Sequence, residues 1–247
     1  MVTINPNERV DDLQNGYFVI QNPQMFCFGI DAVLLASFVK VKSKETVLDL
    51  GTGTAIIPIL LAAKTKATKI IGLEIQKESV QMAQRSIFLN NLQDKVGVHE
   101  GDIKEAVSLY KASSIDVITS NPPYINHGAG ILNDYSPKAI ARHEILCSLE
   151  DIIRSASKLL KYGGRFYMIH RPYRVVDIFS TMCSYNIEPK LLRFVQPYED
   201  KEPNMVLVEG IRSAKPLLKV LPPLIIYKKN GEYTDELMSL YSISKKD

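Results

Sequence analysis

Short apolar runs bounded by turn residues alternate with stretches of helical periodicity through most of the chain. The apolar runs predict strands at Thr46–Leu50, Ile70–Ile75, Val96–Asp102, Ile115–Ser120 and Gly164–His170. Their near-continuous apolar character is typical of strands that are covered on both faces. Helical spacing predicts helices at Ala55–Lys64, Lys77–Asn91, Leu149–Lys161 and Pro172–Tyr185. Strands that alternate with helices predict an α/β fold with a doubly wound, mostly parallel sheet.

The two ends of the chain have weaker patterns than the middle. We expect residues 1–45 to cover the same domain, because they hold one strand-like and one helical run, at Gly16–Gln21 and near Asp31–Phe38. The core extends over residues 46–212, with two late strands predicted at Pro189–Val195 and Met205–Ile211. In residues 213–247 the apolar run PLLKVLPPLIIY predicts a C-terminal tail with a covering strand or a hairpin.

The composition is that of a globular protein. Of the 247 residues, 46% are hydrophobic and 23% are charged, and no apolar run approaches the ~20 residues that a bilayer-spanning helix needs. The first residues show no basic and then apolar leader, so we expect a cytoplasmic location without membrane contact. Neither the four histidines nor the widely separated Cys27, Cys147 and Cys183 have the spacing of a metal site. We therefore expect no disulfide framework and no bound metal.

The charge is unevenly distributed along the chain. Residues 1–150 carry 14 Lys/Arg against 16 Asp/Glu, whereas residues 151–247 carry 16 against 11. The segment Pro137–Arg174 has eight Lys/Arg and three acidic residues. A basic face of this size is compatible with a polyanionic partner such as a nucleic acid, and equally with a solvated surface.

A glycine-containing turn, Asp49-Leu50-Gly51-Thr52-Gly53-Thr54-Ala55, joins the first core strand to the helix that follows. Glycines at such a turn let the backbone bend sharply and approach a ligand closely. Glu74 ends the next strand, where its carboxylate can accept both hydroxyl hydrogens of a ribose. Asp102 ends the third strand and can accept from an adenine amine. Each acid alone could simply cap a helix, but all three features in register predict a nucleoside pocket at the carboxyl edge of the sheet.

The charge of this turn discriminates between nucleoside cofactors. A dinucleotide site usually has a third small residue three positions after the second glycine, whereas here Ala55 follows Gly53 by two. Asp49 would repel a pyrophosphate but attract the cationic amine and the sulfonium of S-adenosylmethionine. We therefore expect S-adenosylmethionine as the cofactor.

A second group, Asn121-Pro122-Pro123-Tyr124, directly follows the fourth strand. Consecutive prolines fix a rigid, extended turn. Asn121 and the Pro122 carbonyl can accept the two hydrogens of an exocyclic amine whose ring stacks on Tyr124. Acceptors at an adenine amine stabilise the positive charge that develops as N6 attacks a sulfonium methyl group. A proline-rich turn without a chemical role is the alternative, but the position after the fourth strand of such a sheet favours a catalytic loop.

With DLGTGT, Glu74, the GD pair at Asp102 and NPPY in this order, the chain resembles class I S-adenosylmethionine-dependent methyltransferases that act on planar amines. The upstream segment Phe26–Leu35, the preceding ERVDDL and the later Ala141-Arg142-His143-Glu144 narrow the resemblance. They are similar to the bacterial tRNA1(Val) (adenine(37)-N6)-methyltransferase family, over roughly Asn7 to Arg212. One departure is Ala55, where relatives often have a third glycine.

The resemblance implies a Rossmann-like sheet of seven strands with an antiparallel last strand. It assigns catalysis to Asn121, Pro122, Pro123 and Tyr124. It assigns cofactor contacts to Asp49, Gly51, Gly53, Glu74 and Asp102, with Phe28, Gly29 and Asp31 covering the methionine end. The implied substrate is a tRNA adenine flipped into the pocket, with the adenine at position 37 of the anticodon loop of tRNA1(Val) as the expected target.

Several side chains of the basic region are candidates for contact with this RNA: Arg142, His143, His170, Arg171 and Arg174. Those near the end of the fifth strand would touch phosphates, and solvated or structural side chains are the alternative for each. We expect a monomer or a weak dimer.

Two other functions stay open at this point. The first is an NPPY methyltransferase that acts on a glutamine amide of a protein release factor or on a guanine N2 of ribosomal RNA. The glutamine enzymes usually carry a helical N-terminal domain, and the about 45 residues before the first cofactor strand are too few for one. The second is a non-catalytic RNA-binding module, which would need neither Asn121 nor Glu74.

Overall fold

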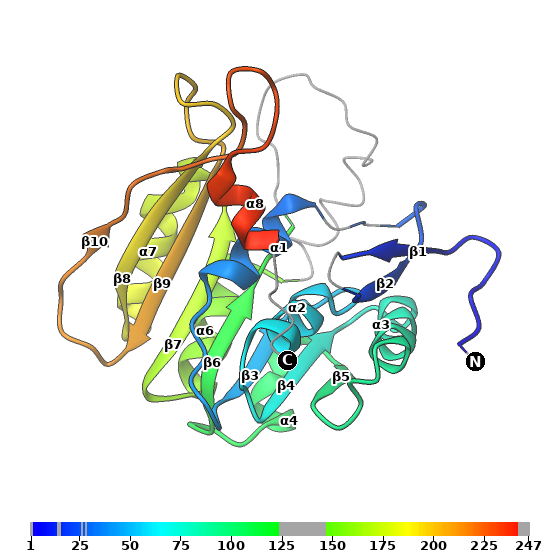
Figure 1. The fold of residues 1–247 in the computed structure, drawn as a ribbon. Helices are drawn as coiled ribbons and strands as arrows, with labels where there is room; N and C mark the ends of the chain where they lie inside the picture. The colour runs from blue at the N-terminus through cyan, green and yellow to red at the C-terminus, as the bar shows by residue number, and fades with distance from the viewer. Residues whose placement is uncertain (1, 14–15, 26, 28, 124–146, 242–247) are drawn as a thin grey trace.

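The computed structural model describes residues 2–13, 16–25, 27, 29–123 and 147–241 of the chain. A central sheet has helices packed on both of its faces (Figure 1). In spatial order its strands are β10 (Lys219–Val220), β8 (Ile187–Gln196), β9 (Met205–Arg212), β7 (Leu160–His170), β6 (Ile115–Ser120), β3 (Thr46–Leu50), β4 (Lys69–Glu74) and β5 (Val96–Glu100). One further strand, β11 (Leu224–Ile225), pairs with β8.

The strand directions confirm the predicted α/β class. Each neighbouring pair from β5 to β7 is parallel, whereas β9 is antiparallel to both β7 and β8. Strands β3 to β9 are the seven that the resemblance implies, with β9 as the antiparallel last strand. The tail adds β10 and β11, each of which pairs parallel to β8. It therefore continues the sheet at its edge, and beyond β11 it turns back in a short hairpin in which Tyr227 and Tyr233 pair antiparallel.

Alternate residues of the strands enter two separate cores. Val47 of β3 packs in the core made with α1 (Ile30–Phe38), α2 (Ile56–Lys64), α3 (Lys77–Leu89) and α8 (Asp235–Tyr241). Its neighbours Leu48 and Leu50 enter the opposite core, with α4 (Ala106–Leu109), α6 (Leu149–Leu159) and α7 (Val175–Ser184). A sheet covered on both faces has no solvent side, which explains the near-continuous apolar runs. None of the helices in the described ranges is long and apolar enough to cross a bilayer.

The N-terminal residues form a small ribbon beside α3 (Figure 1). Strands β1 (Arg9–Asp12) and β2 (Phe18–Gln21) pair antiparallel. The Ile20 amide donates to Ser86 Oγ at 2.9 Å, and the Phe18 amide donates to Asn90 Oδ1 at 2.8 Å. The ribbon thus covers the helix rather than the sheet itself. The polar sequence of β1 gives no apolar signal from which a strand could be predicted.

Several element ends differ from the sequence-based expectation. Helix α6 ends at Leu159 and β7 begins at the next residue, so the helix predicted to reach Lys161 is shorter and the strand longer. Strand β5 ends at Glu100, before Asp102. Pro172 begins a 3₁₀ turn, η2 (Pro172–Arg174), and the α-helical geometry of α7 starts only at Val175. The short elements η1 (Ile103–Glu105), α4 and α8 are too brief to produce a periodic pattern.

Candidate cofactor and substrate site

The predicted site residues gather at one edge of the sheet. Because β3 to β7 run parallel, their carboxyl ends meet at the same edge. Glu74 ends β4, Asp102 follows β5, Asn121 follows β6 and His170 ends β7. The start of α1 reaches this edge through Asp31, which contacts Asn121.

The turn between β3 and α2 has a backbone suited to glycine. Gly51 has a φ of +74° and Gly53 a φ of +55°, in the left-handed region that glycine adopts without strain. The amides of Gly51 and Thr52 both donate to the Leu73 carbonyl of β4, at 2.9 and 3.1 Å. The turn is therefore fixed to the neighbouring strand, and its glycines allow a ligand to approach the backbone closely.

Ala55, at the N-terminal end of α2, shares the left-handed backbone of the two glycines. Its φ is +66° and its ψ is +28°, and its side chain is fully buried. An L-residue is destabilised by roughly 1–2 kcal/mol in this region. The chain therefore keeps a glycine-like conformation at Ala55 and stores strain where the helix begins.

Gly72, in the middle of β4, belongs to the site although the sequence analysis does not single it out. A Cβ at this position would lie 2.5 Å from Thr52 Cγ2 and 2.8 Å from Thr52 Oγ1. A larger residue would therefore push the glycine turn away from the strand. A glycine inside an apolar strand pattern indicates a close approach of another segment, and this signal could have identified Gly72.

The carboxylate of Glu74 holds the same turn from the end of β4. Its Oε2 accepts from the Gly53 amide at 2.9 Å, and its Oε1 accepts from the Gln76 amide at 2.9 Å. The residue is buried. Each carboxylate oxygen has a second lone pair, so it can accept a further hydrogen bond from a ligand. Glu74 thus shapes the turn and also presents acceptors beside it.

Asp49 is a fully buried carboxylate on β3. Its Oδ1 accepts from the hydroxyl of Thr119, its register partner on β6, at 2.6 Å. Within the described part of the chain, Oδ2 has no well-formed hydrogen bond. Burial raises the pKa of Asp49 to about 6; the hydroxyls of Thr119 and Thr52 oppose this shift, and the charge of Glu74 adds to it. A buried carboxylate with an unsatisfied oxygen is stabilised by a cation, so the site fits the cationic amine of an amino-acid-bearing cofactor.

Thr119 is a second residue that the sequence analysis misses. A hydroxyl two residues before a loop motif is unremarkable along the chain. Its role follows from the sheet order, which places β6 beside β3 and brings Thr119 opposite Asp49.

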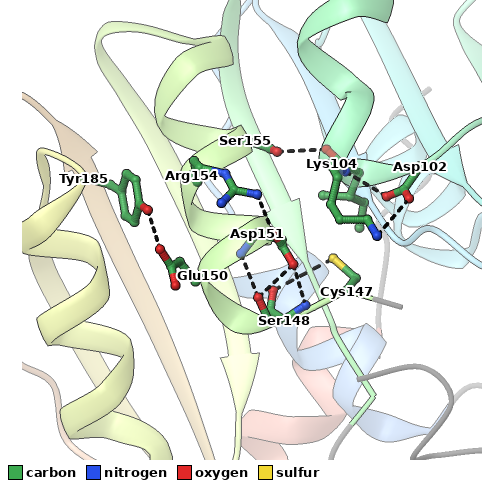
Figure 2. Close-up of polar contacts among 10 residues, drawn as sticks. Asp102, Lys104, Cys147, Ser148, Glu150, Asp151, Arg154, Ser155 and Tyr185 are labelled. Atoms are coloured by element: carbon green, nitrogen blue, oxygen red, sulfur yellow. Dashed lines mark hydrogen bonds and ion pairs between the residues drawn. The ribbon is translucent and has the colours of Figure 1, made fainter. Parts of the chain in front are cut away.

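Asp102 makes local contacts after β5. Its Oδ1 accepts from the Lys104 amide at 2.8 Å and its Oδ2 lies 3.3 Å from Lys104 Nζ, so it caps η1 (Figure 2). Ser155 Oγ of α6 donates to the Ile103 carbonyl at 2.8 Å and ties this turn to the helix. These contacts are those of a helix cap, which the sequence also allowed. The contact between Asp102 and an adenine amine stays a prediction.

Asn121 is paired with Asp31, a residue 90 positions earlier in the chain. Its Nδ2 donates to Asp31 Oδ2 at 3.1 Å, and Asp31 Oδ1 accepts from the Ala32 amide at 2.9 Å. Asp31 is 8% exposed. A Cβ at Gly29 would lie 3.0 Å from Asp31 Oδ1, so the glycine leaves room for this carboxylate. The structure thus joins the predicted catalytic asparagine to a residue that the resemblance assigns to the cofactor.

The two prolines after Asn121 share a small pocket with His170 at the end of β7. They line this pocket together with His170, with Cys147 just before α6, and with Leu149 and Ile152 of α6. The α6 start is rigid, because Ser148 and Asp151 cap each other reciprocally (Figure 2). The proline turn thus lies beside the end of β7 and the capped start of α6.

His170 does not fit the role of a surface phosphate contact. It is 3% exposed, and its Nδ1 accepts from the Arg171 amide at 2.7 Å. Burial, together with the charges of Arg174 and Arg171, lowers the pKa of His170 to about 4. The ring is therefore neutral near pH 7 with its proton on Nε2. The ring lines the same small pocket as Pro122 and Pro123, and its contact with RNA stays a prediction that this burial does not favour.

Arg171 and Arg174 follow β7 at the same sheet edge. Arg171 Nη1 donates to the Asn204 carbonyl at 3.0 Å, and Arg174 Nε pairs with Asp177 at 2.9 Å. Their contact with RNA phosphates stays a prediction. The predicted residues Phe28, Tyr124, Arg142 and His143 lie outside the described residues. In the ranges that the structure describes, no group of three or more His, Cys, Asp or Glu side chains is arranged to hold a metal ion.

The fold and the carboxyl-edge site define a methyltransferase. Residues 41–204 match the family model described as a methyltransferase domain, and the chain belongs to this family. Curated relatives named tRNA1(Val) (adenine(37)-N6)-methyltransferase are similar to it over most of their length. The protein from Porphyromonas gingivalis is 29% identical over 221 residues, covering 86% of both chains. The protein from Tolumonas auensis is 26% identical over 216 residues with the same coverage.

Solved methyltransferase structures share the fold. A predicted O-methyltransferase from Agrobacterium tumefaciens superposes with a TM-score of 0.70 at 24% identity, covering 85% of this chain and 95% of its own. Geranyl diphosphate C-methyltransferase from Streptomyces coelicolor, in complex with S-adenosyl-L-homocysteine, superposes with a TM-score of 0.55 at 13% identity. This match covers 73% of this chain and 79% of the other.

Proposed function

We propose that this protein transfers the methyl group of S-adenosylmethionine to the N6 amine of an adenine in tRNA. The observation that carries the proposal is the position of Asn121, which follows β6 at the sheet edge that also holds the glycine turn and Glu74. The relatives named tRNA1(Val) (adenine(37)-N6)-methyltransferase support adenine 37 of that tRNA as the target. A tRNA substrate would place the reaction in the cytoplasm.

S-adenosylmethionine, when bound, supplies an electrophilic methyl group on a sulfonium. Glu74 would accept the ribose hydroxyls, and Asp49 would face the cationic amine with its unsatisfied oxygen. Gly51 and Gly53 would let the cofactor lie against the backbone. Asp102 would accept from the adenine amine of the cofactor in addition to its contacts with Lys104. Phe28 and Gly29 keep the role at the methionine end that the resemblance implies.

The substrate side needs hydrogen-bond acceptors rather than a general base. The N6 lone pair of adenine is delocalised into the ring, and N6 gains positive charge as the new C–N bond forms and the methyl–sulfur bond breaks. The Asn121 side-chain oxygen and the Pro122 carbonyl would accept the two amine hydrogens and stabilise this charge. The proton leaves N6 after the transfer. The neutral His170, which lines the same pocket as the two prolines, adds no competing positive charge there.

Methyl incorporation tests the proposal directly. The full-length protein is incubated with methyl-labelled S-adenosylmethionine and, separately, with bulk tRNA from cells that lack this protein, with ribosomal RNA and with a peptide release factor. We expect label in tRNA, recovered as N6-methyladenosine by nucleoside mass spectrometry. Label in guanosine of ribosomal RNA or in release-factor glutamine would contradict the proposal. Absence of label from all three, with normal binding of S-adenosylhomocysteine, would indicate a non-catalytic RNA-binding module.

A further inference from the structure

We propose that Asp31 is a positioning residue, which holds the side-chain amide of Asn121 with its oxygen toward the methyl acceptor. The inference rests on the proposed function, because it explains how Asn121 presents an acceptor to an amine. It also changes the role of Asp31, which the resemblance places against the methionine end of the cofactor.

The chemistry of the pair fixes the orientation of the asparagine. An asparagine amide has a donor branch and an acceptor branch of nearly equal size, and an isolated side chain can rotate between them. An ionised carboxylate only accepts hydrogen bonds. The branch that lies 3.1 Å from Asp31 Oδ2 must therefore be the NH₂ group. The oxygen of Asn121 is then turned away from Asp31.

The carboxylate of Asp31 is itself held in place. Its second oxygen accepts from the Ala32 amide at 2.9 Å at the start of α1, and the side chain is buried. A Cβ at position 29 would lie only 3.0 Å from that oxygen, so Gly29 leaves the carboxylate its place. Helix α1 is anchored in turn, because Lys64 Nζ of α2 donates both to Ser37 Oγ of α1, at 2.7 Å, and to the Leu240 carbonyl of α8, at 2.6 Å. A fixed scaffold thus determines where Asp31 meets Asn121.

Both oxygens of Asp31 accept hydrogen bonds, from Ala32 and from Asn121. Position 31 therefore requires a side chain with two acceptors, which aspartate has and asparagine lacks. An asparagine at 31 could accept from Ala32 or from Asn121, but its NH₂ group would face the other donor. Asn121 would then rotate and turn its own NH₂ group toward the substrate amine. Two donors would face each other where an acceptor is required, and the developing charge would lose its stabilisation.

An exchange of the two side chains restores every partner. In the double variant Asp31→Asn with Asn121→Asp, the amide at 31 accepts from Ala32 and donates to the carboxylate at 121. That carboxylate keeps one oxygen for the substrate amine. We expect D31N alone to lower kcat about 10- to 100-fold, as for a small misplacement of a reacting group. N121D alone places two carboxylates together and should lose at least as much, whereas the exchanged pair should recover at least about tenfold over either single variant.

Cofactor affinity separates positioning from cofactor contact. We expect D31N to keep the Kd for S-adenosylhomocysteine within about threefold of the wild type, and to add no loss to Asn121→Ala. The control is Asp116→Asn, at the opposite end of β6, which also accepts from a backbone amide, that of Thr46, at 2.9 Å. It should leave kcat unchanged. A raised Kd with normal kcat at saturation in D31N, or an exchanged pair no better than the single variants, would overturn the proposal.

A measurement without substrate distinguishes this inference from the proposed function. Failure of the wild-type protein to methylate tRNA would refute the proposed function but not the pairing of Asp31 with Asn121. The pair can then be tested by the melting temperatures of the wild type, D31N, N121D and the exchanged pair. We expect the decrease in Tm of the exchanged pair to be at least about 2 °C smaller than the sum of the decreases in the two single variants. Additive effects would overturn the pairing whatever the substrate is.

Discussion

The backbone amide of Gly53 donates to Glu74 Oε2 at 2.9 Å, across 21 positions of sequence. This bond joins the turn after β3 to the carboxylate at the end of β4. The segment that would lie against a cofactor and the side chain that would accept its ribose hydroxyls are therefore one structural unit. A change in either alters the shape of the other.

Glu74→Gln should weaken cofactor binding. An amide can accept from only one of the two backbone donors, Gly53 and Gln76, and loses the charge that strengthens both bonds. We expect the Kd for S-adenosylhomocysteine to rise roughly 30-fold or more, about 2 kcal/mol, by calorimetry. The control is Glu100→Gln, since Glu100 is exposed and lies opposite Glu74 in the β4–β5 register. Normal cofactor affinity in Glu74→Gln would refute the ribose assignment.

Cofactor binding should become weaker below about pH 6. The raised pKa of Asp49, about 6, means that the carboxylate is increasingly protonated in acid. A cationic amine binds the ionised form, so binding lowers this pKa and releases a proton. We expect roughly tenfold lower affinity for S-adenosylhomocysteine at pH 5 than at pH 7.5. Proton release is measured by calorimetry in buffers of different ionisation enthalpy, and Asp49→Asn should abolish it. Equal affinity at both pH values in the wild type would contradict the amine assignment.

His170 should make the fold sensitive to mild acid. Its pKa is about 4 in the folded protein, against 6.5 as the ordinary value. The unfolded chain binds more protons between these values, so the stability due to the neutral ring is complete above pH 6.5 and is lost as the pH falls toward 4. The loss is at most about 3 kcal/mol. Asp49 has the opposite sign over nearly the same range, because its folded pKa is raised.

The His170 contribution is therefore measured as a difference between variants. Denaturant unfolding of the wild type and of His170→Asn, each at pH 4.5, 5.5 and 7, gives the free energy of unfolding. We expect the advantage of the wild type to shrink steadily with acid. A difference independent of pH would show that the imidazole is not held neutral.

Ala55 should tolerate glycine but not valine. A β-branched residue is strongly disfavoured at a φ of +66°. We expect Ala55→Val to destabilise the protein by about 3 kcal/mol or more. In Ala55→Gly the relief of strain offsets the lost methyl burial and the added unfolded-state entropy, so its stability should stay within about 1 kcal/mol of the wild type. Thermal unfolding checks both. A large loss with glycine would mean that the left-handed backbone at Ala55 stores no strain.

Charge reversal of Arg171 and Arg174 should weaken RNA binding. If both side chains contact phosphates, the KM for tRNA rises and its dependence on salt concentration becomes shallower, because fewer counterions are released. The control is Lys158→Glu, since Lys158 is exposed in the last turn of α6, which leads to the opposite edge of the sheet. An unchanged KM and salt slope in the double reversal would make both arginines part of a solvated face.

The sequence alone predicts the layered sheet and the place of each motif along it. Apolar runs mark β3, β4, β6 and β7 because burial on both faces removes polar residues from a strand. Parallel strands share a carboxyl edge, so Glu74 and Asn121 are predicted near one another without coordinates. The family resemblance extended this to a class of enzyme, which the match over residues 41–204 confirms.

The tertiary structure decided how these side chains are used. Periodicity reports only local neighbours, whereas the partner of Asn121 comes from α1, 90 positions away, and that of Asp49 from β6. Burial depends on segments that pack from elsewhere in the chain, which is why His170 is an enclosed neutral ring and not a surface cation. Sequence thus determined which groups stand at the sheet edge, and long-range packing determined their partners, charge and orientation.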